Sequence, residues 1–445
     1  MCWSCYVLRF LTGVVKKDPS IFLKKHIMPL MKGFNRDNGK LVLDDILLSE
    51  IATLHGTPAY VYSASLIKSS FSKYINSVRP NDKICFAVKS NSNISILKLL
   101  NAMGSGFDVV SGNELKRCLL AGAHPQNIVF SGVGKSKEEI RLALNENIFS
   151  INIESENELN RVIDTAEELG VVADCAIRVN PDISAESHPY IQTGLKTSKF
   201  GVTREVALEM SKKIGMNENV NLIGLACHIG SQIIKPELIL DSLEHLIHLA
   251  NEINNNTGTV QFLDIGGGLG ITYKDEESAD PSDIITRAID KLGDSNFDLV
   301  LEPGRSIMGN AGVLLTQVEY IKETENLNFA IIDAGMNDLM RPSLYSAWHN
   351  VTALESKDLK EKTYQIVGPV CESADSLAKD RDLKIEEGSL LAIHDVGAYG
   401  YVMSSNYNTR LRPPEILIEG SKVQVIKRRE SFEDLVSLET EADGS

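Results

Sequence analysis

The sequence predicts an α/β protein that consists of a (β/α)8 barrel followed by a mostly-β domain. In residues 63–309, short apolar runs alternate with longer amphipathic segments, and eight such runs fit the ~250 residues usual for this barrel. Beyond Gly309 the alternation stops, and strand-like runs follow one another with little helix between them. A doubly wound open sheet is the alternative, but no GxGxxG motif follows the first apolar run.

Each expected barrel strand is a short apolar run, and each expected helix has an amphipathic pattern. The strands are expected at residues 83–89, 107–110, 128–131, 150–153, 174–180, 222–228, 260–265 and 298–302. Helices are expected at residues 113–120, 137–145, 156–169, 206–214, 238–253 and 282–291, among others. Because barrel strands run parallel, their carboxyl ends share one face, and the active sites of such barrels lie there.

The chain is expected to divide into five segments. They are a poorly ordered extension (1–30), a segment joining the β domain (31–62), the barrel (63–309), the β domain (310–429) and an acidic tail (430–445). Met28 and Met31 are alternative starts. The early runs 40–44 and 58–62 are strand-like. Strands of the β domain are expected at 312–321, 329–333, 349–354, 363–370, 390–394 and 423–426.

Composition narrows the class of protein. The net charge of −15 argues against a nucleic-acid or anionic-membrane partner. The seven cysteines are odd in number and mostly lie in apolar runs, which predicts a reducing, cytoplasmic compartment. Cys2 and Cys5 have CxxC spacing without a second pair of ligands, so no metal site is expected. No apolar run reaches the length of a transmembrane helix.

The most unusual residue is Lys89, which ends the apolar run of residues 84–88. A lysine amine is costly to bury while it is charged. If its surroundings lower its pKa, the amine becomes a nucleophile that forms a Schiff base with an aldehyde. The alternative is a lysine at the rim of the barrel whose amine reaches water.

Other unusual residues follow the remaining strands at the same face. They are Asp108, Arg178, His228 with Ser231, the glycine-rich run 266–270 and the run 302–305. Each has a structural explanation when taken alone, such as an ion pair, a core imidazole or a tight turn. Their joint position at one end of one barrel favours an active site.

The two loops with glycines follow strands seven and eight, where barrels commonly bind phosphate. The run 266–270 leaves backbone N–H groups open to an anion, and Arg305 adds positive charge. A nucleophilic amine together with a phosphate cup is what pyridoxal 5′-phosphate requires. A carboxylate at Glu302 then suits the pyridine nitrogen, and His228 the face of the ring.

Four spaced motifs carry a resemblance to a known group. Residues 86–91 (FAVKSN), 228–232 (HIGSQ), 264–270 (DIGGGLG) and 302–305 (EPGR) resemble the fold-type III, alanine-racemase-like pyridoxal-phosphate decarboxylases. The C-terminal half, with residues 333–345, 368–373 and 395–400, is most similar to the diaminopimelate decarboxylases of that group. The resemblance extends from about Gly33 to about Arg428.

The resemblance implies a role for each matching residue. Lys89 is implied as the catalytic Schiff-base lysine and Cys371 as the catalytic proton donor. The cofactor-binding residues are then Lys89, Asp108, His228, Ser231, Gly267, Gly268, Glu302, Gly304, Arg305 and Tyr399. The substrate-binding residues are Arg305, Arg341, Tyr345, Glu372 and Tyr399. Cys371 and Glu372 are implied to reach the site of a neighbouring subunit, which makes a homodimer with shared sites the expected assembly.

The implied reaction is the decarboxylation of meso-2,6-diaminopimelate to L-lysine and CO2, the last step of lysine biosynthesis. The distal end of this substrate carries an ammonium and a carboxylate, so the site needs an acid, Glu372, beside the arginines Arg305 and Arg341. A decarboxylase of ornithine, arginine or carboxynorspermidine, a racemase and a non-catalytic regulator are the alternatives. The segment 182–199 has a length typical of a cover over the substrate.

Overall fold

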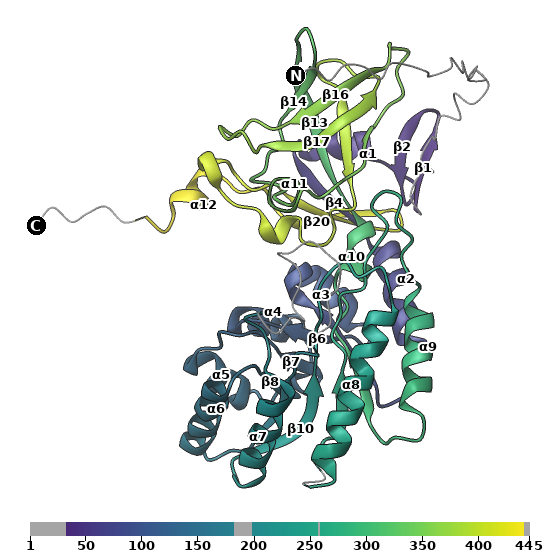
Figure 1. Cartoon of the computed structure of the whole chain (residues 1–445). Helices are drawn as coiled ribbons and strands as arrows, with labels where there is room; N and C mark the ends of the chain where they lie inside the picture. The colour runs from purple at the N-terminus through teal and green to yellow at the C-terminus, as the bar shows by residue number, and fades with distance from the viewer. Residues whose placement is uncertain (1–32, 182–197, 257–258, 440–445) are drawn as a thin grey trace, which may run out of the picture.

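The computed structural model describes residues 33–181, 198–256 and 259–439. The expected extension over 1–30 and residues 440–445 of the expected tail lie outside these ranges, as does nearly all of the segment 182–199. Within the described part of the chain, no helix combines the length and apolar character needed to cross a membrane. The chain forms two parts, a barrel and a β domain, which meet near α10 (Arg305–Met308) (Figure 1).

The barrel is closed and all its strands are parallel, in the order β10-β11-β12-β5-β6-β7-β8-β9. Its strands are β5 (Lys83–Ala87), β6 (Gly106–Val109), β7 (Ile128–Phe130), β8 (Ser150–Ile153), β9 (Ala173–Arg178), β10 (Val220–Ala226), β11 (Phe262–Asp264) and β12 (Asp298–Leu301). The predicted fold class is therefore confirmed. Most predicted strands overran the carboxyl end by one or two residues, because burial continues from several strands into the loop that follows; Val110 after β6 is an exposed exception.

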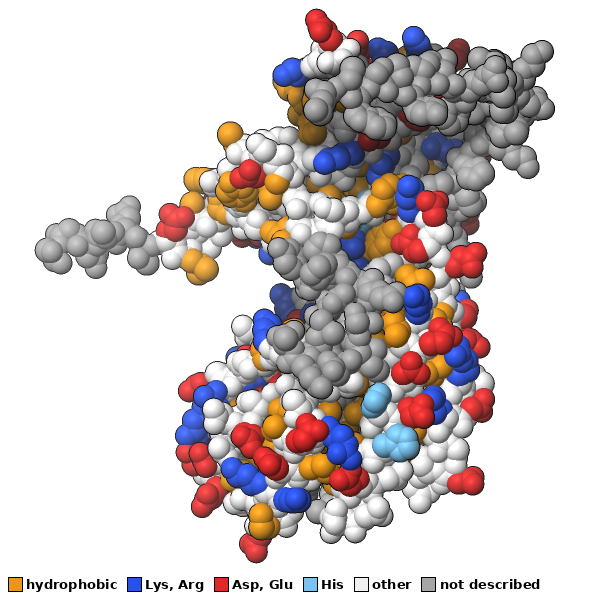
Figure 2. Space-filling view, viewed as in Figure 1, with side chains coloured by type: hydrophobic (Ala, Val, Ile, Leu, Met, Phe, Trp, Pro, Cys, Tyr) orange, Lys and Arg blue, Asp and Glu red, His pale blue; other side chains and the backbone are white. Residues whose placement is uncertain are grey.

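Helices cover the outside of the barrel. They are α2 (Ala64–Ile75), α3 (Ile94–Asn101), α4 (Gly112–Leu120), α5 (Lys137–Asn145), α6 (Glu156–Leu169), α7 (Arg204–Gly215), α8 (Glu237–Asn254) and α9 (Pro281–Leu292). Serine caps fix several of their starts: Ser136 and Glu139 form a reciprocal capping box at α5. Figure 2 shows acidic and basic side chains intermixed over these helices on the visible face.

The inside of the barrel is filled below the site. Cys85, Val129, Ala176, Phe262 and Val300 form a buried cluster contributed by five strands. The ring of Phe262 lies so close to β10 that a Cβ on Gly224 would overlap it. The lower barrel is thus a packed core, and only its carboxyl end is left for chemistry.

The β domain is built on a nine-stranded sheet with the path β17-β16-β14-β13-β4-β19-β20; off this path, β18 pairs with β13 and β15 pairs with β18. Its strands are β4 (Ala59–Ser63), β13 (Gly312–Glu323), β14 (Asn328–Ile332), β15 (Val351–Ala353), β16 (Lys362–Val367), β17 (Ser376–Leu383), β18 (Leu390–His394), β19 (Glu415–Glu419) and β20 (Lys422–Lys427). The early strand β4 lies at its centre, antiparallel to β13 and parallel to β19.

The first strand-like run forms a different sheet. Strand β2 (Lys40–Leu43) pairs with β1 (Phe34–Asp37) and β3 (Ile46–Leu47) in a three-stranded sheet of its own. It touches the β domain through a bridge between Lys40 and Glu355. At the other end of the chain, the described part of the expected tail contains a short helix, α12 (Phe432–Val436).

Candidate active site

Lys89 lies in a single turn of 3-10 helix, Val88–Ser90, directly after β5. Its amine pairs with the carboxylate of Asp108 on β6, and its side chain is one-third exposed. Burial disfavours the ammonium, but the charges of Asp108 and Glu302 outweigh burial and raise the pKa of Lys89. The chain by itself therefore does not meet the condition of a lowered lysine pKa that was considered from the sequence. The amine becomes a nucleophile only when its proton is removed, and Asp108 is the nearest base.

Three buried carboxyl groups face the inside of this end of the barrel: Asp108, Asp264 and Glu302. Burial, reinforced by the two neighbouring acids, raises the pKa of Glu302 well above its ordinary value. Burial likewise raises the pKa of Asp264 to about 6, and its Oδ1 accepts the Gly266 N–H at 2.8 Å. Because one lysine does not neutralise three acids, the carboxyl groups at this end of the barrel tend to hold protons or to attract a further cation.

The glycine run after β11 packs tightly on the neighbouring loops. A Cβ on Gly267 would overlap the carbonyl oxygen of Glu302, and a Cβ on Gly268, at φ +93°, would overlap that of Gly230. The Gly267 N–H donates to Nδ1 of His228 at 3.2 Å. Burial, with Arg178 and Lys89 nearby, lowers the pKa of His228 well below its ordinary value, so its imidazole is neutral.

Gly304 and Arg305 open the short helix α10 beside this glycine run. A Cβ on Gly304 would come within 3.0 Å of the side chains of Ala87 and Ser90. The Arg305 guanidinium, only 6% exposed, donates to Ser231 Oγ at 2.9 Å. This contact places the arginine at the glycine-lined cradle.

Tyr399 connects the β domain to this end of the barrel. Its ring lies 4.9 Å from the Arg305 guanidinium, and its N–H donates to the carbonyl oxygen of Ser90 at 2.8 Å. It adopts a positive φ of 56°. An unfavourable backbone conformation of this kind is kept only where the surrounding contacts determine it. The two parts of the chain therefore both contribute to the site.

A second arginine, Arg341, begins the helix α11 (Arg341–Tyr345) of the β domain and is 5% exposed. The ring of Tyr273 lies 4.7 Å from its guanidinium, and the Tyr273 hydroxyl accepts a hydrogen bond from Arg305 at 2.6 Å. Tyr345, at the end of α11, lies close enough to Arg305 and Arg341 to act on the pKa of both electrostatically, in the raising direction. In the described part of the chain neither arginine has an ion pair with a carboxylate, and the Nε of each is buried without a partner.

Two further residues of this site were not among the sequence candidates. His349 Nε2 accepts a hydrogen bond from Arg341 at 2.8 Å, and Tyr273 contacts both arginines. Tyr273 comes three residues after the glycine run, and this spacing is a signal that could have been used. His349 was counted only as the first residue of a strand, and no local pattern marks it.

Cys371 and Glu372 lie apart from this cluster. Both are exposed, on the loop between β16 and β17. The Cys371 N–H donates to Asn408 Oδ1 at 2.8 Å, while the Glu372 carboxylate accepts the N–H of Ser373 at 2.9 Å. No hydrogen bond or ion pair among the described residues joins either of them to Lys89. A single chain brings the other candidates together at the carboxyl end of the barrel and leaves these two outside.

Arg178 has the structural role that was its alternative explanation. Its guanidinium pairs with Glu154 at 2.9 Å and lies 4.8 Å from the ring of Phe200. It therefore supports Phe200, which lies shortly before α7, rather than supplying a free charge.

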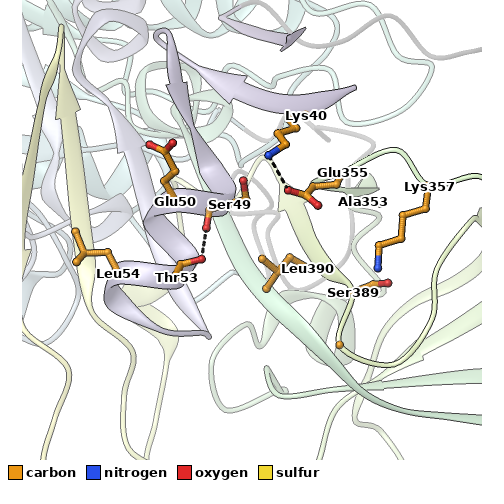
Figure 3. A pocket seen from close by; sticks show the side chains of 11 residues that line it. Lys40, Ser49, Glu50, Thr53, Leu54, Ala353, Glu355, Lys357, Ser389 and Leu390 are labelled. Carbon is orange, nitrogen blue, oxygen red and sulfur yellow. Dashed lines mark hydrogen bonds and ion pairs between the residues drawn. The ribbon is translucent and has the colours of Figure 1, made fainter. Parts of the chain in front are cut away.

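A groove of about 560 Å³ lies elsewhere, between α1 (Leu48–His55) and the β domain (Figure 3). Lys40 and Glu355, which line it, pair with each other at 3.5 Å. The Thr53 hydroxyl donates to the Ser49 carbonyl oxygen at 2.8 Å. None of the candidate site residues lines this groove, and several of its polar groups already have partners.

A barrel that presents one lysine amine between buried acids and a glycine-lined cradle is the architecture of a pyridoxal-phosphate enzyme. Residues 64–309 match the family model described as "Pyridoxal-dependent decarboxylase, pyridoxal binding domain". The chain is 46% identical to the diaminopimelate decarboxylase of Pseudomonas aeruginosa, over 92% of this chain and 99% of that protein. It is 44% identical to that of Vibrio cholerae over the same shares. The chain belongs to the diaminopimelate decarboxylase family of pyridoxal-dependent decarboxylases.

Solved structures agree with this assignment. The diaminopimelate decarboxylase of Helicobacter pylori complexed with L-lysine superposes with a TM-score of 0.85 at 42% identity, covering 88% of this chain and 99% of that one. The enzyme of M. jannaschii in complex with L-lysine gives a TM-score of 0.88 at 36% identity, covering 92% and 98%.

Proposed function

We propose that the chain decarboxylates meso-2,6-diaminopimelate to L-lysine and CO2, with pyridoxal 5′-phosphate as its cofactor. The observation that carries this proposal is the pair of buried guanidiniums, Arg305 and Arg341, which have no carboxylate partner in the described chain and lie in the same site as Lys89. Two uncompensated buried cations require an anion, and a planar guanidinium matches a carboxylate. A diamine-forming decarboxylase has no distal carboxylate to offer them.

The residues present fit the cofactor. Oδ1 of Asp108 is buried without a partner among the described residues, beside the amine of Lys89. Gly267 and Gly268 approach the neighbouring loops so closely that no Cβ would fit, and a Cβ on Gly304 would crowd Ala87 and Ser90. We assign Lys89 to the aldehyde, Ser231 and the glycines to the phosphate, and His228 to the face of the ring. When bound, the cofactor supplies a ring that accepts the electron pair left by the departing carboxylate.

Glu302 is the residue we assign to the ring nitrogen. Burial and the neighbouring acids hold a proton on this carboxyl group, so Glu302 can share that proton with a basic nitrogen. The Ser131 hydroxyl donates to Glu302 Oε1 at 3.2 Å and keeps the group oriented. By sharing its proton with the ring nitrogen, Glu302 would set how strongly the cofactor ring attracts electrons.

We propose that Cys371 and Glu372 act in the site of a second copy of the chain. Both are exposed, and a single chain does not bring them to Lys89. In a homodimer with shared sites, the Cys371 thiol would deliver a proton to the carbon that lost CO2. Glu372 would bind the distal ammonium beside the arginines that bind the distal carboxylate. Tyr345 and Tyr399 complete the lining of the substrate end.

The test is CO2 release by the protein reconstituted with pyridoxal phosphate. We expect release from meso-diaminopimelate, with L-lysine formed, and none from L-ornithine, L-arginine or carboxynorspermidine. Release from one of these three instead would contradict the assignment of Arg305 and Arg341 to a distal carboxylate. Absence of release from all four would contradict the decarboxylase proposal itself.

A further inference from the structure

We propose that His349 and Tyr273 are positioning residues that hold the Arg341 guanidinium in the orientation needed for the distal carboxylate of the substrate. This inference rests on the proposed function and extends it. His349 is fully buried and Tyr273 is nearly so. Tyr273 follows the glycine run of the barrel and His349 precedes β15 of the β domain. Two parts of the chain therefore act on one arginine.

The hydrogen bonds of His349 determine its protonation. Its Nδ1 lies 2.8 Å from the carbonyl oxygen of His394, which can only accept, so Nδ1 carries a proton. Its Nε2 lies 2.8 Å from Nη1 of Arg341, which can only donate, so Nε2 is bare. The imidazole is thus a neutral acceptor. Burial, together with the charge of Arg341, lowers the pKa of His349 and keeps it in this form.

Two contacts hold His349 in place, one to its backbone and one to its ring. The Arg381 guanidinium donates to its carbonyl oxygen at 2.8 Å. The Tyr273 ring meets the imidazole edge-on, with centroids 5.5 Å apart and an angle of 83° between planes. An acceptor fixed in this way sets the rotation of the guanidinium that donates to it.

Tyr273 fixes the plane of the same guanidinium. Its ring lies 4.7 Å from the Arg341 guanidinium, a distance at which a cation is attracted to the aromatic face. Its hydroxyl accepts from Arg305 at 2.6 Å, so this one side chain contacts both guanidiniums. With rotation and plane both fixed, the remaining N–H groups of Arg341 are preorganised for a carboxylate.

The role predicts an effect on substrate binding rather than on the chemical step. We expect His349→Leu, which leaves an Arg341 N–H without its acceptor, to raise KM for meso-diaminopimelate about tenfold or more and to change kcat by less than about twofold. His349→Gln should recover part of the loss, because an amide oxygen can accept from Arg341. Tyr273→Phe keeps the ring and loses the hydroxyl, which contacts both arginines, so its KM should rise less than that of His349→Leu.

A double-mutant cycle separates positioning from general support of the fold. If His349 acts through Arg341, His349→Leu should add little to the KM of an Arg341→Ala variant. Melting temperature and cofactor absorbance of each holoenzyme identify any variant that has lost its fold, and His349→Gln then carries the test. An unchanged KM in His349→Leu, or full additivity with Arg341→Ala, would overturn the inference.

A binding measurement keeps this test independent of the reaction. Pimelate has the carbon chain and both carboxylates of the substrate without its amino groups. Calorimetry should show that the holoenzymes of His349→Leu and Arg341→Ala both bind pimelate more weakly than the unmodified holoenzyme does. If the enzyme releases no CO2 from meso-diaminopimelate, the proposed function fails, yet this weakening would still support the positioning role. Equal pimelate affinity in His349→Leu and the unmodified protein would refute it.

Discussion

The surroundings of Lys89 and the loop that carries Cys371 differ in almost every physical respect. Lys89 lies among buried acids that raise its pKa, on a rigid barrel whose core is packed beneath it. Cys371 is exposed on a loop of the β domain and makes only a backbone contact with Asn408 among the described residues. The difference teaches that a single chain brings together the residues that we assign to the cofactor, while Cys371, which we assign as proton donor, stays exposed. Cofactor binding and turnover should therefore respond separately to substitution.

The largest effect is expected at the lysine. Lys89→Ala removes the amine that we assign to the cofactor aldehyde, so activity should fall below detection and the visible absorbance of bound cofactor should disappear. Lys68→Ala, which removes an exposed lysine paired with Glu419, is the matched control and should leave both unchanged. A retained visible band in Lys89→Ala would contradict the assignment.

The next effect distinguishes the two regions directly. Cys371→Ala should lower turnover by about 10²- to 10⁴-fold, the range for loss of a general acid, while cofactor absorbance stays normal. Ser373→Ala, an exposed neighbour, is the control. Near-normal turnover in Cys371→Ala would remove this residue as the proton donor.

Mixing the two inactive variants tests whether the sites are shared between subunits. A heterodimer of Lys89→Ala and Cys371→Ala would contain one site with both residues intact, so random exchange should restore about a quarter of the normal activity. If each chain used its own cysteine, no site would be repaired and mixing would restore nothing.

A smaller effect concerns the cost of burying acids near Lys89. When folding raises the pKa of a carboxyl group, the free energy of unfolding of the protein falls as the pH rises from the unfolded pKa to the folded pKa of that group. For Asp264 this window runs from its ordinary 3.8 to about 6. Asp264→Asn removes this loss, so the cofactor-free variant should melt a few degrees above the unmodified protein at pH 7 and equally at about pH 4. A lower melting temperature at pH 7 would contradict the prediction.

The smallest effect is expected beside Cys371. Asn408 has a positive φ of 55°, so glycine removes its side chain without adding backbone strain. Asn408→Gly should lower turnover about fivefold, the equivalent of one hydrogen bond of about 1 kcal/mol. Asn408→Asp keeps an acceptor for the Cys371 N–H and should stay close to normal. Equal losses in both variants would show that the contact does not position the cysteine loop.

The sequence was sufficient for the barrel because local periodicity and parallel topology together determine where strand ends meet. Lys89, Asp108, His228 and Glu302 all lie at the expected end, although they sit in loops or at strand termini rather than inside longer strands. Their electrostatic coupling was not predictable. The raised pKa of Lys89 depends on distances between residues far apart in the chain, and local pattern does not contain them.

The β domain was predicted less completely, for a physical reason. Strand β17 carries four charged residues in succession, so its apolar pattern is weak, and in β19 three apolar residues follow one another without alternation. His349 and Tyr273 escaped prediction because a positioning residue is defined by the neighbour it contacts. The assignments of Cys371 and Glu372 depend on a second chain and remain predictions.

The place of β4 has a consequence for how the protein is made. Tyr60 and Tyr62, both fully buried, pair with residues beyond the barrel on one side and with residues near the end of the chain, such as Glu415, on the other. During synthesis β4 emerges early and has no strand to pair with until the whole barrel, then β13, and finally β19 have left the ribosome. A nascent chain that stops after the barrel therefore exposes an unpaired apolar strand that is prone to aggregate. The cell has to protect this strand until translation is complete.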